Sequence, residues 1–148
     1  IKQVLDCGAM GIVAQMVMDA DEARRIVAAT KYPPRGDRSV GGALHALNYG
    51  TNAETYFQRA DDEILVIIQA EHIDAVGRAE EIYAVPGIDA VFIGPNDLAA
   101  TMRGPDGTPP SKEAFEAAIA RVREAAATCG IASGLHVYSA ACLLYTSD

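Results

Sequence analysis

The sequence predicts an α/β fold in which parallel strands, joined by crossover helices, form part of a (β/α) barrel. Short apolar runs rich in Val and Ile carry no alternation of polar residues, which is typical of strands buried on both faces. These runs alternate strictly with helical stretches, and this order indicates parallel strands. About four strands are apparent, whereas a closed barrel has eight strands in typically ~250 residues, so we expect a partial barrel.

The strands are expected at residues 11–14, 64–68, 90–93 and 132–137. The helices are expected at residues 21–30, 52–60, 73–85 and 112–128. Ser111 is a suitable N-cap for the last helix, and Gly130 is a suitable C′ residue after it. A dinucleotide-binding fold would carry G-x-G-x-x-G after a strand, but residues 8–11 (GAMG) precede a strand and have the wrong spacing. Residues 32–49 read as a loop, and long ordered loops at strand ends often carry sites.

The composition excludes several classes of protein. The formal net charge of −8 argues against nucleic acid as a partner, because binding to phosphate backbones draws on clustered Lys and Arg. No apolar run approaches the length of a membrane span. The three cysteines, Cys7, Cys129 and Cys142, are far apart, which fits neither a zinc site nor a disulfide framework and favours the cytoplasm. The N-terminus shows no signal-peptide pattern and no initiator Met, so we expect it to be incomplete.

Two acidic side chains follow neighbouring strands of the predicted sheet. The strand at residues 64–68 continues into Gln69 and Glu71, whose side chains emerge on one face. One crossover later, the strand at residues 90–93 is followed by Asp97. Because the carboxyl ends of parallel strands share one edge, both carboxylates can reach a single ion there. Two oxygen ligands are too few for calcium but suit Mg²⁺ or Mn²⁺, whose other positions go to water and substrate.

The turn after the strand at residues 90–93 offers a second polar feature. The backbone amides around Gly94 and Pro95, including that of Asn96, are placed to receive a substrate carboxylate. Spacing alone leaves another interpretation open, in which Glu71 and Asp97 only cap the helices that follow the two strands.

Three motifs resemble one known family. Residues 32–39 (YPPRGDRS), 69–71 (QAE) and 86–98 (PGIDAVFIGPNDL) are similar, in order and with few gaps, to the HpcH/HpaI aldolases. The resemblance implies a TIM (β/α)8 barrel of the phosphoenolpyruvate/pyruvate type, of which about four strands are present here. It extends to about residue 141, so we expect residues 1–141 to be an incomplete barrel domain. Residues 142–148 resemble no part of the family and are interpreted as a non-native tail.

The resemblance also implies an activity and a site. A metal-dependent aldolase would cleave a 4-hydroxy-2-oxo acid or a 2-keto-3-deoxy sugar acid to pyruvate and an aldehyde. The metal, Mg²⁺, Mn²⁺ or Co²⁺, would be held by Glu71 and Asp97. The substrate-binding residues would be Gln69, Gly94, Asn96 and Asp97. No catalytic residue is assigned in this chain, because the family's base and its enolate-stabilising Arg correspond to positions before Ile1. The family assembles as a homo-hexamer.

Two other functions stay open. The first is an enzyme similar to citrate lyase β-subunits and malyl-CoA lyases, which would act on a coenzyme A thioester. The second is an inactive truncated fragment with unpaired strand edges. Three further residues were weighed for roles at the site: we expect His72 to face solvent, His45 not to replace the base, and His136 to end the last strand on the catalytic face. Arg38 is expected to order its own loop or to bind substrate.

Overall fold

Four parallel strands in the order β1-β2-β3-β4 form the centre of the chain, in a computed structural model that describes residues 1–137. The strands are β1 (Gly11–Ala14), β2 (Leu65–Ala70), β3 (Ala90–Ile93) and β4 (Ala132–Leu135). The helices are α1 (Lys2–Asp6), α2 (Ala20–Thr30), the 3-10 helix η1 (Leu44–Tyr49), α3 (Ala53–Glu63), α4 (Ile73–Val76), α5 (Ala79–Tyr83), α6 (Pro95–Thr101) and α7 (Lys112–Cys129). The expected parallel α/β order is confirmed, while the interpretation of residues 142–148 as a tail concerns residues outside those described.

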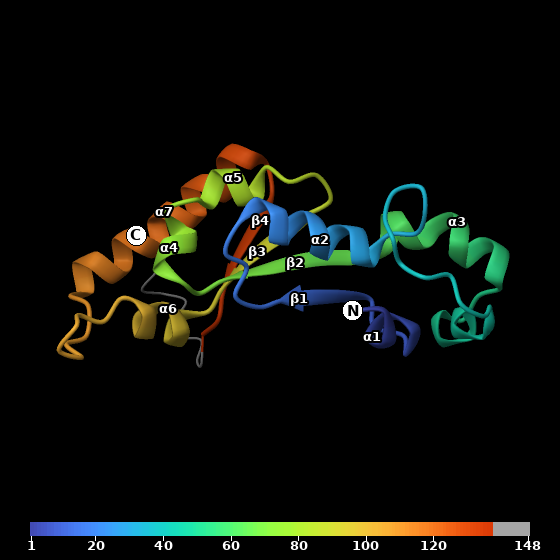
Figure 1. Cartoon of the computed structure of the whole chain (residues 1–148), viewed down its shortest axis with the longest axis horizontal. Helices are drawn as coiled ribbons and strands as arrows, with labels where there is room; N and C mark the ends of the chain where they lie inside the picture. Colours follow the sequence, from blue (N-terminus) through green and yellow to red (C-terminus); the bar gives the residue numbers. More distant parts are fainter. Residues whose placement is uncertain (138–148) are drawn as a thin grey trace.

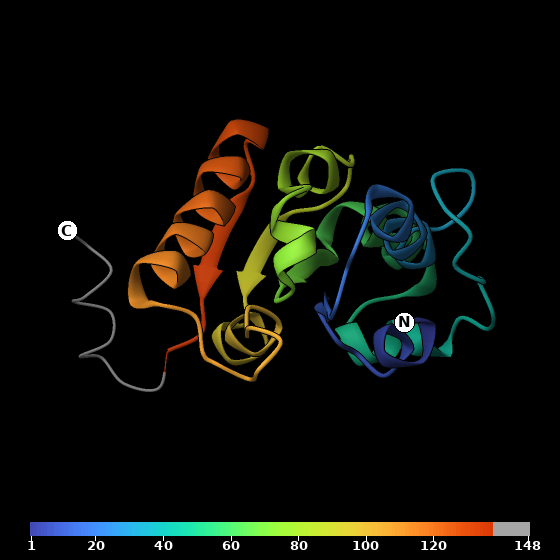
Figure 2. The ribbon, with the colours of Figure 1, turned by 60° about the vertical axis from the view of Figure 1, so that its left-hand side comes forward.

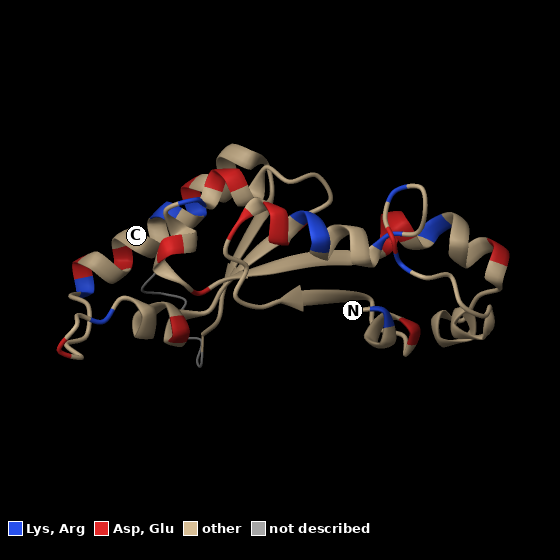
Figure 3. Cartoon of the chain, viewed as in Figure 1, with Lys and Arg blue, Asp and Glu red and all other residues tan. Residues whose placement is uncertain are grey.

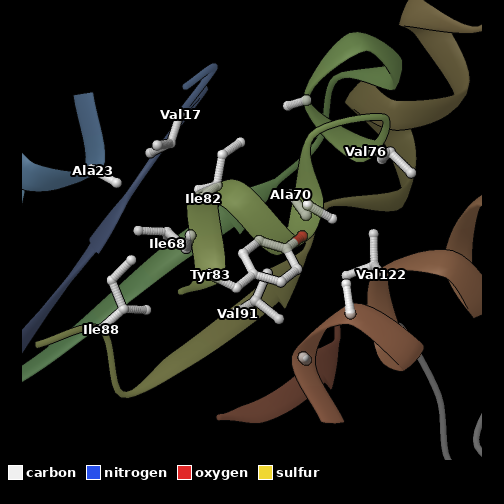
Figure 4. Packing of buried hydrophobic residues seen from close by; sticks show 14 of the residues in the cluster. Val17, Ala23, Ile68, Ala70, Val76, Ile82, Tyr83, Ile88, Val91 and Val122 are labelled. Atoms are coloured by element: carbon white, nitrogen blue, oxygen red, sulfur yellow. The ribbon is translucent and has the colours of Figure 1, made fainter. Parts of the chain in front are cut away.

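The two faces of the sheet differ. Helices α2, α4, α5 and α7 lie on one side of it, which we call the outer face (Figures 1 and 2). The main core lies between them, where Ile68, Val91 and Val122 are almost fully buried (Figure 4). On the opposite, inner face, Val13 and Leu65 are each 50% exposed. Strands expected to be buried on both faces are therefore buried on one face only in the described chain, as in a barrel that is not closed.

The polar residues at the helix ends explain where the longer helices begin. The side chains of Asp19, Asn52 and Ser111 accept hydrogen bonds from backbone N–H groups in the first turns of α2, α3 and α7. Helix α7 ends at Gly130, which adopts the left-handed conformation with a φ of 72°. The predicted cap and C′ residue of this helix are confirmed.

The predicted helix at residues 73–85 is wrong as a single helix. Helix α4 ends at Gly77, and α5 begins after Arg78, whose φ of −111° and ψ of 17° are not helical. Glycine has low helix propensity, and the break lets both short helices place apolar side chains in the core, Val76 from α4 and Ile82 from α5. Strand β2 also extends to Ala70, two residues beyond its predicted end.

The loop at residues 32–49 lies at the amino ends of the strands and not at the site. Its second half forms η1. Arg38 is buried, and its Nη2 donates to Asp6 Oδ1 at 2.8 Å and to the hydroxyl of Tyr56 at 2.9 Å. The hydroxyl of Tyr49 donates to the carbonyl of Ala9 at 2.8 Å. These contacts attach the loop to α1 and to the segment before β1, so Arg38 orders its own loop, one of the two roles expected for it.

Among residues 1–137, charged side chains lie on the helices and loops, and none lies in the four strands (Figure 3). Among the described residues, no helix has the length and apolarity needed to cross a membrane.

Candidate active site

The carboxyl ends of the four strands share one edge of the sheet, and the predicted site residues gather there. Strands β3 and β4 point toward helix α6, which follows β3 directly (Figure 2). Gln69 and Glu71 lie at the end of β2, and Gly94 follows β3, the neighbouring strand. The predicted adjacency of the two strand ends is confirmed by the pairing of Ala70 with Ile93.

Glu71 is the central acid of this edge. Only 3% of the residue is exposed. Its Oε1 accepts a hydrogen bond from the backbone N–H of Met16 at 2.8 Å, and its Oε2 accepts one from Gln69 Nε2 at 2.6 Å. Within residues 1–137, no Lys, Arg or His forms an ion pair with this carboxylate. A buried carboxylate is costly when it lacks a cationic partner, so the arrangement favours a bound cation.

Gly94 makes room for the Glu71 and Gln69 side chains. A Cβ atom at this position would lie 2.6 Å from Gln69 Nε2 and 2.9 Å from Glu71 Oε2, both closer than real Cβ contacts. The N–H of Gly94 donates to the carbonyl of Ala70 at 3.1 Å and is occupied by this bond. Gly94 therefore contributes space to the site, and its own amide does not serve as the anion donor that the sequence suggested.

Asn96 and Asp97 lie in the first turn of α6, which begins with Gly94 as N-cap and Pro95 as N1. Both residues are exposed. Backbone N–H groups in the first turn of a helix have no intrahelical partners, and an acid there is favoured by the helix dipole. The structure thus places the second predicted carboxylate on the turn that follows the strand next to Glu71.

The donor set fits a divalent cation with an open coordination sphere. Within the described residues, no group of three or more His, Cys, Asp or Glu side chains could hold a metal. Glu71 and Asp97 follow two neighbouring strands, and carboxylate oxygens are ligands that Mg²⁺ or Mn²⁺ accepts with water or substrate in the other positions. Each Glu71 oxygen already accepts one hydrogen bond and keeps a second lone pair.

Two histidines and the three lysines have other places or contacts in the fold. His72 accepts a hydrogen bond from the N–H of Asp74 at 3.2 Å through Nδ1 and so caps α4. His45 is buried and its Nε2 lies 3.2 Å from the hydroxyl of Tyr32, at the other end of the sheet, so it does not replace a catalytic base. The lysines lie at position 2 in α1, at position 31 after α2 and at position 112 in α7, so none stands at the carboxyl end of a strand as a Schiff-base nucleophile would.

The amide of Met16 is a site feature that sequence reasoning missed. Met16 has a φ of 51°, which is unusual for a residue other than glycine. This conformation accompanies the turn after β1 in which its N–H donates to Glu71, a residue 55 positions later in the chain. No local pattern in the sequence predicts such a bond.

Comparisons with known proteins identify the family and its named relatives. The family model HpcH/HpaI aldolase/citrate lyase matches residues 1–143. The chain is 46% identical over 121 residues to a hydroxypyruvate/pyruvate aldolase of Cupriavidus necator, covering 80% of this chain and 45% of that protein. It is 44% identical over 134 residues to a 4-hydroxy-2-oxo-heptane-1,7-dioate aldolase of Shigella flexneri, covering 88% of this chain and 50% of that protein.

A solved structure shows the same fold. The HpcH/HpaI aldolase of Desulfitobacterium hafniense superposes with a TM-score of 0.83 at 33% identity, covering 97% of this chain and 55% of that chain. The described sheet is therefore part of a larger (β/α) barrel-type fold, as expected from the sequence. The chain spans about half the length of the curated relatives that it matches.

Proposed function

The chain belongs to the HpcH/HpaI aldolase/citrate lyase family, and from this premise we propose that it is part of a metal-dependent aldolase. The reaction would cleave a 4-hydroxy-2-oxo acid or a 2-keto-3-deoxy sugar acid between C3 and C4, giving pyruvate and an aldehyde. The observation that carries the proposal is the buried carboxylate of Glu71, which has hydrogen bonds but no ion pair within residues 1–137, at the edge where the neighbouring strand leads to Asp97.

Glu71 and Asp97 would hold Mg²⁺, Mn²⁺ or Co²⁺. A bound divalent ion would supply Lewis-acid polarisation of the 2-keto oxygen, which favours the enolate of pyruvate when the carbon–carbon bond breaks. The chain's own contribution is to fix the ligand: Met16 and Gln69 each hold one oxygen of Glu71. The placement of all three lysines away from the strand ends supports metal chemistry over a Schiff base.

The substrate would bind between these ligands and the first turn of α6. Gln69 would contact the substrate from β2. The backbone N–H groups at Asn96 and Asp97 would receive the carboxylate of the 2-keto acid, since the N-terminus of a helix favours an anion. We assign neither the catalytic base nor the enolate-stabilising Arg to this chain.

We further propose that the complete protein works in the cytoplasm as a homo-hexamer on a small-molecule 2-keto acid. Within residues 1–137, Cys7 and Cys129 are free thiols, which supports a reducing compartment. The names of the relatives, at 46% and 44% identity, support an aldolase over an enzyme acting on a coenzyme A thioester.

The proposal can be tested in a chimaera in which this chain forms part of a complete barrel. Residues 1–137 would replace the matching segment of the Shigella flexneri aldolase, and pyruvate release from 4-hydroxy-2-oxo acids would be measured with Mn²⁺ and with EDTA. We expect release that needs the metal and falls at least about a hundredfold in Glu71→Gln and in Asp97→Asn. Matched controls are Glu63→Gln and Asp62→Asn, two exposed acids at the end of α3.

Two outcomes would count against the proposal. Release that survives EDTA and both substitutions would rule out the metal mechanism. Absence of release from a folded chimaera would favour the alternative that these residues no longer support catalysis.

A further inference from the structure

Hydrogen bonds between the strands continue one residue beyond the ends of β3 and β4 and bring a third residue to the level of Glu71. Ala70, Ile93 and Leu135 are register partners across β2, β3 and β4. One residue later, the N–H of Gly94 donates to the carbonyl of Ala70 at 3.1 Å, and the N–H of His136 donates to the carbonyl of Ile93 at 3.2 Å. Glu71, Gly94 and His136 therefore stand side by side on three neighbouring strands.

The side chain of His136 lies on the inner face, with Gln69 and Glu71. The preceding residue, Leu135, packs against the outer-face core, and successive side chains in a strand point to opposite faces. The ring of Phe92 confirms this direction, because its centroid lies 6.1 Å from that of His136 at an interplanar angle of 36°. Phe92 pairs in register with Gln69, so it belongs to the same inner face.

Phe92 lies on the inner face two residues before Gly94 on β3. A Cβ atom at Gly134, the register partner of Phe92 on β4, would lie 3.7 Å from Phe92 Cδ2. Gly134 thus lies beside the aromatic ring, at a distance where a Cβ atom would make only an ordinary contact. The ring of His136 therefore packs against Phe92 at the end of the strand.

In the four strands within residues 1–137, polar side chains of the inner face occur only near its carboxyl edge. The inner-face positions of β1, β2 and β3 below this edge are apolar: Val13, Leu65, Ile67, Ala90 and Phe92. At the edge, Glu71 and His136 flank Gly94, which has no side chain. Two inter-strand spacings separate their Cα atoms, roughly 10 Å. The side chains of Gln69 and Glu71 occupy the space over Gly94, so a molecule bound beside Glu71 would have the imidazole of His136 on its β4 side.

We propose that His136 is a specificity-determining residue that contacts the aldehyde half of the substrate and selects aldehydes bearing a hydroxyl or carboxylate group. This inference rests on the aldolase function proposed above. If the 2-keto acid half is held beside Glu71 and α6, the part of the substrate beyond C4 would extend past the Gln69 and Glu71 side chains toward β4. An imidazole can both donate and accept a hydrogen bond, so it recognises a polar substituent that an apolar residue would leave unpaired.

The test uses the chimaera that carries residues 1–137, run in the direction of aldol addition. Pyruvate would be combined with glycolaldehyde, which bears a hydroxyl, or with propanal, which does not. We expect His136→Leu to lower kcat/KM for glycolaldehyde by about tenfold or more while propanal changes by less than about twofold. His136→Gln, which keeps a donor and an acceptor, should recover part of the loss. Ser133→Ala, on the outer face of the same strand, is the matched control.

Further readouts separate this inference from the proposed function and from a structural effect. The KM for pyruvate and the Mn²⁺ dissociation constant should stay within about twofold in both His136 variants. Equal losses for the two aldehydes, or no loss for either, would overturn the role of His136 while leaving the aldolase intact. A parent chimaera that binds Mn²⁺ but forms no aldol would overturn both proposals.

Discussion

Replacing Gly94 by Ala would test whether the space above this residue positions Glu71, the proposed metal ligand. The new Cβ would lie 2.6 Å from Gln69 Nε2 and 2.9 Å from Glu71 Oε2, whereas ordinary contacts begin at 3.4 Å. The Gln69 amide must therefore withdraw by roughly 0.8 Å and the Glu71 carboxylate by roughly 0.5 Å, while metal–ligand distances tolerate only about 0.2 Å. We expect the affinity for Mn²⁺ to fall about 10- to 100-fold, as when a partner that orients a metal ligand is lost.

The assay is calorimetric titration of the chain with Mn²⁺, accompanied by thermal unfolding. Gly94 has an ordinary φ of −92°, so alanine adds no backbone strain and the unfolding temperature should change little. Gly134→Ala is the matched control, because its Cβ would make only an ordinary contact of 3.7 Å with Phe92. Parental Mn²⁺ affinity in Gly94→Ala, with the fold intact, would refute the claim that this gap positions Glu71.

Three more predictions concern charge and stability. Glu71→Gln should abolish Mn²⁺ binding yet leave the free energy of unfolding within about 1 kcal/mol of the parent, because removal of a buried charge offsets the one hydrogen bond that the new NH2 group cannot accept; a loss of several kcal/mol in chemical denaturation would contradict this. Arg38→Met should lower the free energy of unfolding by about 2 kcal/mol in the same assay, since two hydrogen bonds from a buried guanidinium are lost. Burial opposes ionisation of Asp6, but hydrogen bonds from Lys2 and Arg38 outweigh this effect and hold the pKa of Asp6 below its ordinary 3.8. The ionised Asp6 therefore contributes to the free energy of unfolding fully above pH 3.8, and this contribution is lost as the pH falls through the lower, folded-state pKa. The same contribution should be smaller in Arg38→Met. Ser111→Ala should cost about 1 kcal/mol by removing the cap of α7, and urea unfolding that matches the parent would count against this.

Local patterns in the sequence determined the elements and one edge of the site. Apolar runs without polar alternation identified the strands, and Ser111 and Gly130 marked the ends of α7. Because consecutive strands joined by crossovers are adjacent and parallel, the sequence also placed Gln69, Glu71 and Gly94 together. The break between α4 and α5 was missed, since packing against the core decided it rather than helical periodicity.

Only the tertiary structure decided which groups meet at long range. The hydrogen bond from the Met16 amide to Glu71 joins residues 55 positions apart. It depends on a positive φ at Met16, and methionine is not a residue type from which a positive φ would be predicted. The position of His136 beside Gly94 depends on the register between β3 and β4. A shift of one residue in this register would place the imidazole on the outer face, which the helices cover. Sequence periodicity records which face of an element is apolar, whereas register and hydrogen bonds between distant segments arise only when those faces pack together.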